Sequence, residues 1–281
     1  MAHQTYFYLK MLLRNNLLLD LDEYSLIDTP QYGLVCNFMG IRLASAFQSV
    51  LQADGKVVGR EALLRAGLLE HGEVTPYGAF EEAGRVNRLV QFDRLVRVIH
   101  LMNHARSFAE HELLFLNVHP GLLGSVNDHG RTFERILHYY SVPTSHVVIE
   151  IREMANQEDE VLTNAVANYR SLGYRIAVDD FGTAHSSLER ILKLQPDIIK
   201  LDGALIQAAE HSRSAADSLT YLVSRFHKAG IQVTVKGIET DRQLAVARNA
   251  GADLLQGYHL ARPEFAATTR GQLCRSEQLA A

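Results

Sequence analysis

Acidic, amide and ammonium side chains stand at the ends of several short apolar runs that lie far apart along the chain. The residues that share this position are Glu61, Asn117, Glu150, Asp179, Asp180, Lys200, Lys236, Glu239 and Gln256. If the runs are strands of one parallel barrel, their carboxyl ends meet at one rim, where barrel enzymes carry their catalytic groups. Each residue taken singly has an ordinary structural explanation, such as an ion pair or a turn cap. Their recurrence at strand ends predicts one functional site.

The chemistry of this set favours a metal-dependent site. Carboxylates gathered in a pocket of low dielectric repel one another unless cations compensate them. Oxygen ligands without a cysteine cluster or a spaced histidine pair favour Mg2+ or Mn2+ over zinc. The adjacent pair Asp179 and Asp180 suits a bridging carboxylate beside a ligand of a second ion. That arrangement is used in two-metal phosphodiester hydrolysis.

The elements that must position these residues form a repeating pattern. From about residue 113 onward, short β-branched runs alternate with amphipathic stretches, which is typical of parallel βα units and predicts an α/β barrel. The expected strands are Leu113–Val118, His146–Ile151, Arg175–Val178, Asp197–Leu201, Ile231–Val235 and Asp253–Leu255. Earlier in the chain, the runs Phe47–Leu51 and Lys56–Gly59 predict a hairpin that leads into Glu61. A barrel-covering helix is expected where Leu89, Phe92, Val96 and Ile99 share one face.

Length and composition exclude several classes of protein. A chain of 281 residues with a net charge of -4 suits one barrel domain and lacks the broad basic field that binds duplex nucleic acid. Cys36 and Cys274 lie at opposite ends of the sequence, which predicts neither a disulfide framework nor a cysteine zinc site and favours the reducing cytoplasm. Polar residues interrupt the apolar stretch Tyr6–Leu19 before the ~20 residues that a membrane span needs. We therefore expect no membrane span.

Seven motifs in order resemble one known family. Glu61-Ala62-Leu63-Leu64-Arg65 is similar to the motif that names the Glu-Ala-Leu (EAL) domain of cyclic-di-GMP phosphodiesterases. The similarity continues through Leu116-Asn117-Val118, Glu150-Ile151-Arg152-Glu153, Asp179-Asp180-Phe181-Gly182-Thr183, Pro196 to Asp202, Gly237-Ile238-Glu239-Thr240 and Gln256-Gly257-Tyr258. The expected domain division is an N-terminal extension at residues 1–40, an EAL-type barrel at 41–264 and a tail at 265–281.

The resemblance implies a modified (β/α)8 barrel, similar to the TIM barrel, whose first strand is antiparallel. It also implies hydrolysis of cyclic-di-GMP to the linear dinucleotide pGpG with Mg2+ or Mn2+. In this family pattern, Glu61, Asn117, Glu150 and Asp179 hold the first ion, and Asp180 holds the second with Asp179 bridging. Lys200 positions the attacking water, while Glu239 and Gln256 belong to the catalytic group and Gln256 supports the site.

The same resemblance implies a ligand surface and a coupling loop. Leu63 and Arg65 contact cyclic-di-GMP, with Arg65 as a phosphate clamp. The other ligand-binding positions are Gln48, Asp202, Arg262 and Pro263. Glu153 anchors the loop that begins at Asp179 and couples the site to dimerisation, so a homodimer is among the expected assemblies.

One departure from the family pattern bears on catalysis. The family carries a glutamate, required for turnover, at the position that Lys236 occupies here. A protonated ammonium cannot coordinate Mg2+ and brings its own charge to the position of the second ion. Three hypotheses follow: a cyclic-di-GMP receptor with impaired hydrolysis, an active phosphodiesterase, or a protein-interaction module that needs no nucleotide and docks a protein partner.

Overall fold

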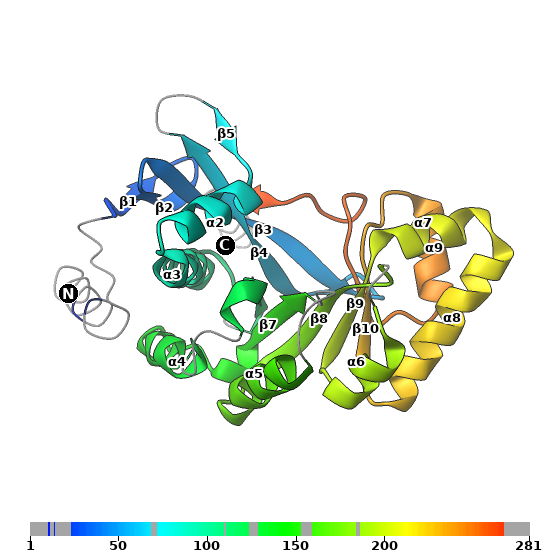
Figure 1. Ribbon diagram of the computed structural model, residues 1–281. Helices are drawn as coiled ribbons and strands as arrows, with labels where there is room; N and C mark the ends of the chain where they lie inside the picture. Colours follow the sequence, from blue (N-terminus) through cyan, green and yellow to red (C-terminus); the bar gives the residue numbers. More distant parts are fainter. Residues whose placement is uncertain are drawn as a thin grey trace.

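A computed structural model describes residues 24–68, 72–109, 111–123, 129–152, 159–183 and 186–266, together with Met11 and Arg14. Within this part of the chain, eight strands close into a barrel (Figure 1). In ring order they are β3 (Ile41–Gln52), β11 (Leu254–Leu255), β10 (Gln232–Val235), β9 (Ile198–Leu201), β8 (Arg175–Phe181), β7 (Val147–Arg152), β6 (Leu113–Asn117) and β4 (Val57–Leu68). β4 pairs with β3 to close the ring, and β3 is antiparallel to both of its neighbours. The structure confirms the predicted α/β barrel with one antiparallel strand.

The predicted strands are confirmed, with small shifts at their ends. β6, β7, β9, β10 and β11 begin within one residue of the expected positions. β8 continues beyond the expected Val178 through Asp179 and Asp180 to Phe181. The continuation places both aspartates inside a strand rather than in the loop that follows it.

The hairpin of β3 and β4 is much longer than the sequence pattern predicts. Each strand has 12 residues, and their pairing runs from Leu51 opposite Val57 to Ile41 opposite Leu68. Beyond the barrel the hairpin carries a second group of strands: β1 (Ile27–Thr29), β2 (Gly33–Phe38), β5 (Glu73–Val74) and β12 (Glu264–Phe265). Most of β3 is buried on both faces, so its sequence lacks the alternation that marks a half-exposed strand. Residues 27–38 of the expected extension thus continue the sheet.

The helix expected from the apolar pattern around Phe92 is α3 (Leu89–Ser107), which follows α2 (Pro76–Arg85). α3 lies against β2, β3 and β6, and most of its residues are buried (Figure 1). Its buried Asn103 clamps β2, because the side-chain Oδ1 accepts from the Leu34 N–H at 2.9 Å and Nδ2 donates to the Leu34 carbonyl at 2.9 Å. The clamp ties the N-terminal strands to the barrel.

The remaining helices cover the outside of the barrel. They are α4 (His129–Tyr139), α5 (Asp159–Ser171), α6 (Leu188–Leu194), α7 (Gly203–His211), α8 (Arg213–Lys228) and α9 (Asp241–Asn249), with 3-10 turns at Pro120–Leu122 and Thr144–His146. Side-chain oxygens of Ser187, Asp202, Ser212 and Thr240 accept backbone N–H groups at the helix starts, as capping residues do. Among the described residues, no helix combines the length and apolar character that crossing a membrane requires.

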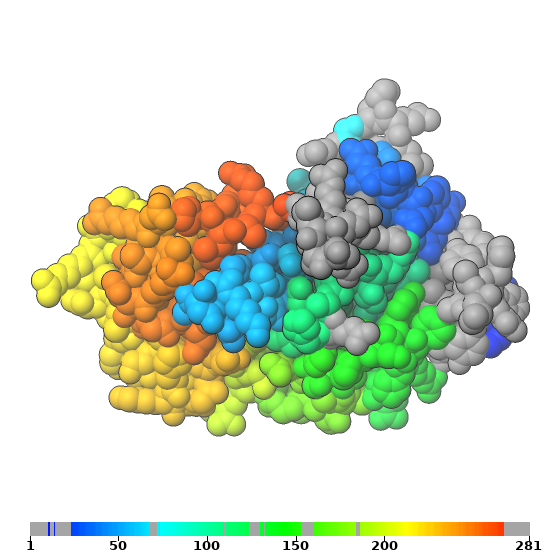
Figure 2. All heavy atoms as spheres, turned by 180° about the vertical axis from the view of Figure 1, so that it is seen from behind, coloured from blue at the N-terminus to red at the C-terminus, as the bar shows by residue number. Residues whose placement is uncertain are grey.

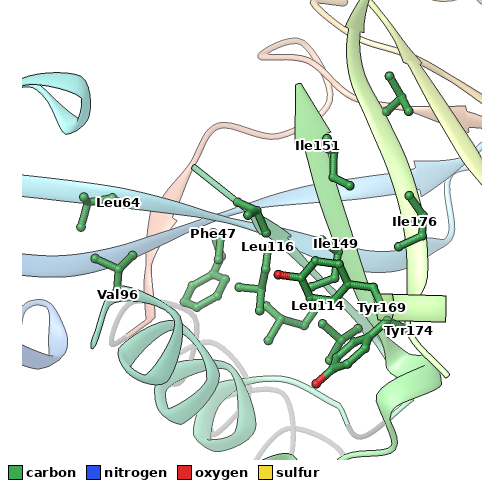
Figure 3. Packing of buried hydrophobic residues seen from close by; sticks show 14 of the residues in the cluster. Phe47, Leu64, Val96, Leu114, Leu116, Ile149, Ile151, Tyr169, Tyr174 and Ile176 are labelled. Carbon is green, nitrogen blue, oxygen red and sulfur yellow. The ribbon is translucent and has the colours of Figure 1, made fainter. Parts of the chain in front are cut away.

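Apolar side chains pack in two places. The larger cluster lies between the strands and the helices, where Leu114, Leu116, Ile149 and Ile176 face Tyr169 and Tyr174 (Figure 3). The smaller cluster is Val50, Phe115, Val148, Ala177, Ile198 and Leu254. Its members alternate along the strands with those of the larger cluster, so they fill the barrel interior. Figure 2 shows the blue β3–β4 hairpin between the orange C-terminal elements and the green middle of the chain, as its pairing with β11 and β6 requires.

Candidate functional site

The polar residues predicted to form one site lie directly above the apolar layer of the barrel interior. Side chains two positions apart on a strand face the same side. On the five parallel strands β6 to β9 and β11, the interior residue is therefore followed two positions later by a polar one, namely Asn117, Glu150, Asp179, Lys200 and Gln256 after Phe115, Val148, Ala177, Ile198 and Leu254. On β4, Glu61 follows Gly59 in the same way. The strand order brings these side chains to one rim.

Gly59 shows how tightly this layer is filled. A Cβ atom at this position would lie 2.4 Å from the carbonyl oxygen of Leu113 and 2.9 Å from the ring of Phe115. The absence of a side chain at Gly59 therefore leaves this space to the Phe115 ring. The ammonium of Lys200 lies 5.8 Å from the centroid of the same ring.

A first network of hydrogen bonds centres on Lys200, whose side chain is fully buried. Its Nζ donates to Glu61 Oε2 at 2.7 Å and to Glu150 Oε1 at 2.6 Å. Glu61 also accepts from Asn117 Nδ2 at 3.1 Å and from Gln256 Nε2 at 2.7 Å. The network joins four barrel strands and the residue after β11, and the name "first network" denotes these five residues below.

The two carboxylates of the first network differ in their electrostatics. Burial disfavours ionisation of Glu61, but the charge of Lys200 and hydrogen bonds from Lys200, Gln256 and Asn117 outweigh it and lower its pKa to about 2. Burial and the nearby charges of Glu61 and Asp179 raise the pKa of Glu150 despite the contact with Lys200. For Lys200, burial opposes the charge, but Glu150, Glu61 and Asp179 raise the pKa above its usual range. Glu61 is thus the anionic partner that Lys200 holds most firmly.

A second network centres on Lys236, which follows β10. Its Nζ donates to Asp179 Oδ1 at 2.6 Å and to Asp180 Oδ1 at 2.5 Å. A guanidinium nitrogen of Arg152 lies 2.5 Å from Asp180 Oδ2. Burial disfavours the charged form of Lys236, but the carboxylates of Asp179 and Asp180 outweigh both this and the charge of Lys200, and they raise its pKa. Lys236 is therefore an ammonium at neutral pH.

A bulge in β8 allows two adjacent aspartates to reach one ammonium. Successive side chains of a regular strand point to opposite faces. The pairing of β8 with β9 shifts register between Val178 and Phe181, and Asp180 has a φ of 58°, in the left-handed region. Such a local reversal turns one side chain toward the face of its neighbour. The carboxylates of Asp179 and Asp180 consequently meet at Lys236.

The predicted ligand-binding residues occupy several places around this rim. Leu63 and Arg65 are half-buried on β4 and share the face of Glu61. Gln48 lies opposite Glu61 on β3, and its amide links Gln256, at 3.3 Å, to the carbonyl of Ala261, at 3.0 Å. These side chains border the first network.

The remaining predicted residues lie farther from the two networks. Asp202 caps α7 by accepting from the Ala204 N–H at 2.9 Å. Arg262 is exposed with its guanidinium 4.9 Å from the Tyr258 ring centroid, and Pro263 follows it half-buried. Glu239 is exposed, and among the described interactions its carboxylate joins neither network. Glu153 lies outside the described residues.

Arg152 is the member of the site to which the sequence patterns assigned no role. The sequence could have indicated its place in the site, because it lies two residues after Glu150 on β7 and both side chains therefore share one face. Its partner could not be inferred in this way, because the contact depends on the bulge that turns Asp180.

The two networks differ in their fitness for a metal ion. In the first network Glu150 Oε2 is buried without a hydrogen-bond partner among the described residues, and the oxygen-rich donor set suits a hard divalent cation. In the second network two cationic side chains already neutralise two carboxylates. The described residues contain no group of three or more acidic, histidine or cysteine side chains arranged to hold a metal. In each network a lysine ammonium bonds both carboxylates. The donors fit one ion beside Glu150 and do not fit a second ion at Asp180.

Comparison with known proteins identifies relatives of this barrel. The chain is 29% identical over 224 residues to the bifunctional diguanylate cyclase/cyclic di-GMP phosphodiesterase MucR of Pseudomonas aeruginosa, covering 76% of this chain and 32% of MucR. It is 31% identical over 223 residues to the EAL-domain containing protein YkuI of Bacillus subtilis, covering 77% of this chain and 54% of YkuI. The chain therefore spans about a third of MucR and about half of YkuI.

Solved structures have the same fold. The MucR phosphodiesterase in complex with c-di-GMP superposes with a TM-score of 0.71 at 24% identity, covering 80% of this chain and 93% of that one. YkuI in complex with c-di-GMP and calcium superposes with a TM-score of 0.67 at 27% identity, covering 85% and 62%. The family model of the EAL domain matches residues 39–263, which include both networks. The chain belongs to the EAL domain family.

Proposed function

We propose that this chain binds cyclic-di-GMP at the barrel rim and hydrolyses it slowly or not at all. The observation that carries the proposal is the position of Lys236, whose ammonium contacts both Asp179 and Asp180. Family membership and the c-di-GMP complexes of MucR and YkuI support the identity of the ligand.

The chemistry of an ammonium explains the expected loss of turnover. A protonated amine has three donors and no lone pair, so it cannot act as a ligand. Its charge at Asp179 and Asp180 repels a divalent ion that would use the same oxygens. It offers no Lewis acidity with which to lower the pKa of a water molecule. Lys236 therefore neutralises the aspartates without supplying the chemistry of a second metal.

The first network supports binding of one Mg2+ or Mn2+ ion. Glu61, Asn117 and Glu150 of the first network would hold it together with Asp179, whose Oδ1 accepts from Lys236. Such an ion would polarise a phosphodiester oxygen. Lys200 holds Glu61 and Glu150 in place through its two hydrogen bonds. Arg65 on the same face of β4 is suited to clamp a phosphate. The family pattern suggests that Arg262 and Pro263 cover a base, and the Arg262 guanidinium lies 4.9 Å from the Tyr258 ring centroid.

A second candidate function is active hydrolysis of cyclic-di-GMP to pGpG. The observation that favours it is the complete first network, since Glu61, Asn117, Glu150, Lys200 and Gln256 are in contact with one another. A purely protein-binding role is disfavoured by the same completeness. A homodimer coupled through Glu153, and a protein partner, remain proposals that follow from the family pattern.

The deciding experiment compares Lys236→Glu with the parent protein. Each is incubated with cyclic-di-GMP and excess Mn2+, and pGpG is measured by chromatography. Calorimetry in Ca2+ measures nucleotide binding. We expect binding by both proteins and a hydrolysis rate at least roughly a hundredfold higher for Lys236→Glu, the scale of a restored catalytic carboxylate.

Lys236→Gln is the matched control, because it removes the charge and supplies a neutral amide oxygen in place of a carboxylate. A gain for Lys236→Glu but not for Lys236→Gln would assign the defect to the missing carboxylate. Rapid pGpG formation by the parent would support the active phosphodiesterase instead, and absence of nucleotide binding would leave the protein-binding function.

A further inference from the structure

Asp180 is bound by two different cationic side chains, one on each carboxylate oxygen. Lys236 Nζ lies 2.5 Å from Oδ1, and Arg152 Nη2 lies 2.5 Å from Oδ2. The Asp180 side chain is 20% exposed and the Arg152 side chain 62% exposed. The carboxylate is thus nearly enclosed, while the guanidinium approaches it from solvent.

The position of Arg152 beside Asp180 follows from the pairing of strands β7 and β8. Arg152 is the last residue of β7 and pairs in register with Asp179 on β8. Glu150 lies two residues earlier on the same face, so Arg152 stands directly above the first network. The left-handed backbone at Asp180, φ 58°, turns the second aspartate toward this side.

We propose that Arg152 is a positioning residue that, together with Lys236, closes the second metal position by holding Asp180. The inference rests on the proposed function, in which Asp179 and Asp180 mark that position. Two side chains with unit positive charge take the place of one divalent ion. The closure is therefore built from two independent parts on different strands, β7 and the segment after β10.

Because Lys236 and Arg152 each bind Asp180, removing one or both should affect the binding of a second metal ion differently. In Lys236→Glu a new carboxylate is present, but Arg152 still occupies Asp180 Oδ2 and its charge still opposes a metal ion. Removing both cationic side chains frees Asp180 completely. A second metal ion should therefore bind well only to the double variant.

The test is Mn2+ binding without nucleotide, followed by the electron paramagnetic resonance signal of free Mn2+. The proteins are the parent, Lys236→Glu, and Lys236→Glu combined with Arg152→Gln or with Arg152→Lys. We expect one ion per parent chain. A second ion should bind roughly tenfold more tightly to Lys236→Glu/Arg152→Gln than to Lys236→Glu, the scale for removing one nearby, partly exposed charge.

Arg152→Lys is the matched control, because it keeps the charge and changes the shape. The combination Lys236→Glu/Arg152→Lys should bind the second ion as weakly as Lys236→Glu alone. Thermal unfolding verifies that every variant is folded. Equal affinity of the second ion for Lys236→Glu and Lys236→Glu/Arg152→Gln would overturn the role of Arg152, as would absence of a second ion from both.

This measurement separates the inference from the proposed function. Fast hydrolysis by the parent would refute impaired turnover, whatever the Mn2+ counts of the variants. A tight second Mn2+ ion on the parent itself would refute the closure of the second position, even if the parent is slow. The two claims thus fail on different observations.

Discussion

The first network, around Lys200, and the second network, around Lys236, are built from similar residues but reach different electrostatic states. Each has two carboxylates that share one lysine ammonium. The first is buried except at Asn117, relies on the neutral amides of Asn117 and Gln256, and leaves Glu150 Oε2 without a partner among the described residues. The second is closer to solvent and adds the guanidinium of Arg152. The first network has one cationic side chain for two carboxylates, whereas the second has two cationic side chains for two carboxylates.

The difference shows that a lysine ammonium has different electrostatic effects in the barrel interior and at its rim. In the interior, Lys200 is required because two buried carboxylates without a counter-charge would be very costly. At the rim, solvent screening weakens the same interaction, and a second cation can be added from the surface. We therefore expect the number of cations, rather than the number of carboxylates, to decide which position can accept a metal ion.

The largest expected effect is the loss of stability when Lys200 is removed. Lys200→Met keeps the volume of the side chain but leaves Glu61 and Glu150 buried beside each other without a cation. We expect a loss of roughly 3 kcal/mol or more in the free energy of unfolding. Urea unfolding in the presence of a chelator measures it, and a loss below that of the matched variant Lys236→Met would contradict the comparison.

The next effect is stabilisation by a divalent ion through the first network. At a Mn2+ concentration about 100 times the dissociation constant, binding to the folded state adds about 2.7 kcal/mol. Glu150→Gln should abolish most of this gain because it replaces the carboxylate that holds the unpartnered oxygen. Asp180→Asn should keep it. Thermal unfolding with and without Mn2+ tests both variants, and equal losses would show that the two networks do not differ in metal binding.

The stability of the protein in acid also depends on a buried residue that belongs to neither network. His100 on α3 is buried against Ser45, at 2.8 Å, and burial followed by the charge of Arg65 lowers its pKa from 6.5 to about 3. Below pH 6.5 the unfolded chain therefore binds a proton that the folded chain does not. Stability should fall by about 1.4 kcal/mol per pH unit between pH 6.5 and 3 from this residue.

The control for acid stability is His100→Asn, which keeps a polar atom near Ser45 and does not titrate. Its stability should depend less steeply on pH than that of the parent, as followed by urea unfolding at several pH values. An unchanged slope would assign the acid sensitivity to other groups, including the carboxylates of the two networks.

The smallest expected effect is that of Lys236→Met on stability. The Lys236 side chain is 19% exposed, and Arg152 continues to neutralise Asp180 after the substitution. The nearly buried Asp179, 5% exposed, loses its cation, so we expect a loss of about 1–2 kcal/mol in the free energy of unfolding, smaller than that of Lys200→Met. A loss similar to that of Lys200→Met would mean that the second network is as important for folding as the first.

The sequence predicted those parts of this protein whose structure follows from a local residue pattern, namely the barrel strands and the polar residues at their ends. Short β-branched runs predicted the barrel strands from β6 to β11, because a parallel strand covered on both faces must be apolar along its length. Polar residues at the ends of those runs, such as Glu150 and Lys200, predicted the rim. The motifs after Glu61 predicted the EAL family, which the family model confirms over residues 39–263.

The tertiary structure decided the contacts that depend on backbone direction and on long-range packing. The left-handed conformation of Asp180 is not encoded by a glycine, yet it places two adjacent carboxylates on one ammonium and opens one of them to Arg152. The lengths of the 12-residue strands β3 and β4 were likewise underestimated, since β3 is buried on both faces, pairs with β2 and packs against α3. Sequence determined which charged residues reach the rim, because strand periodicity is local. Only the folded chain decided which of them pair, because ion pairs form between segments more than 20 residues apart.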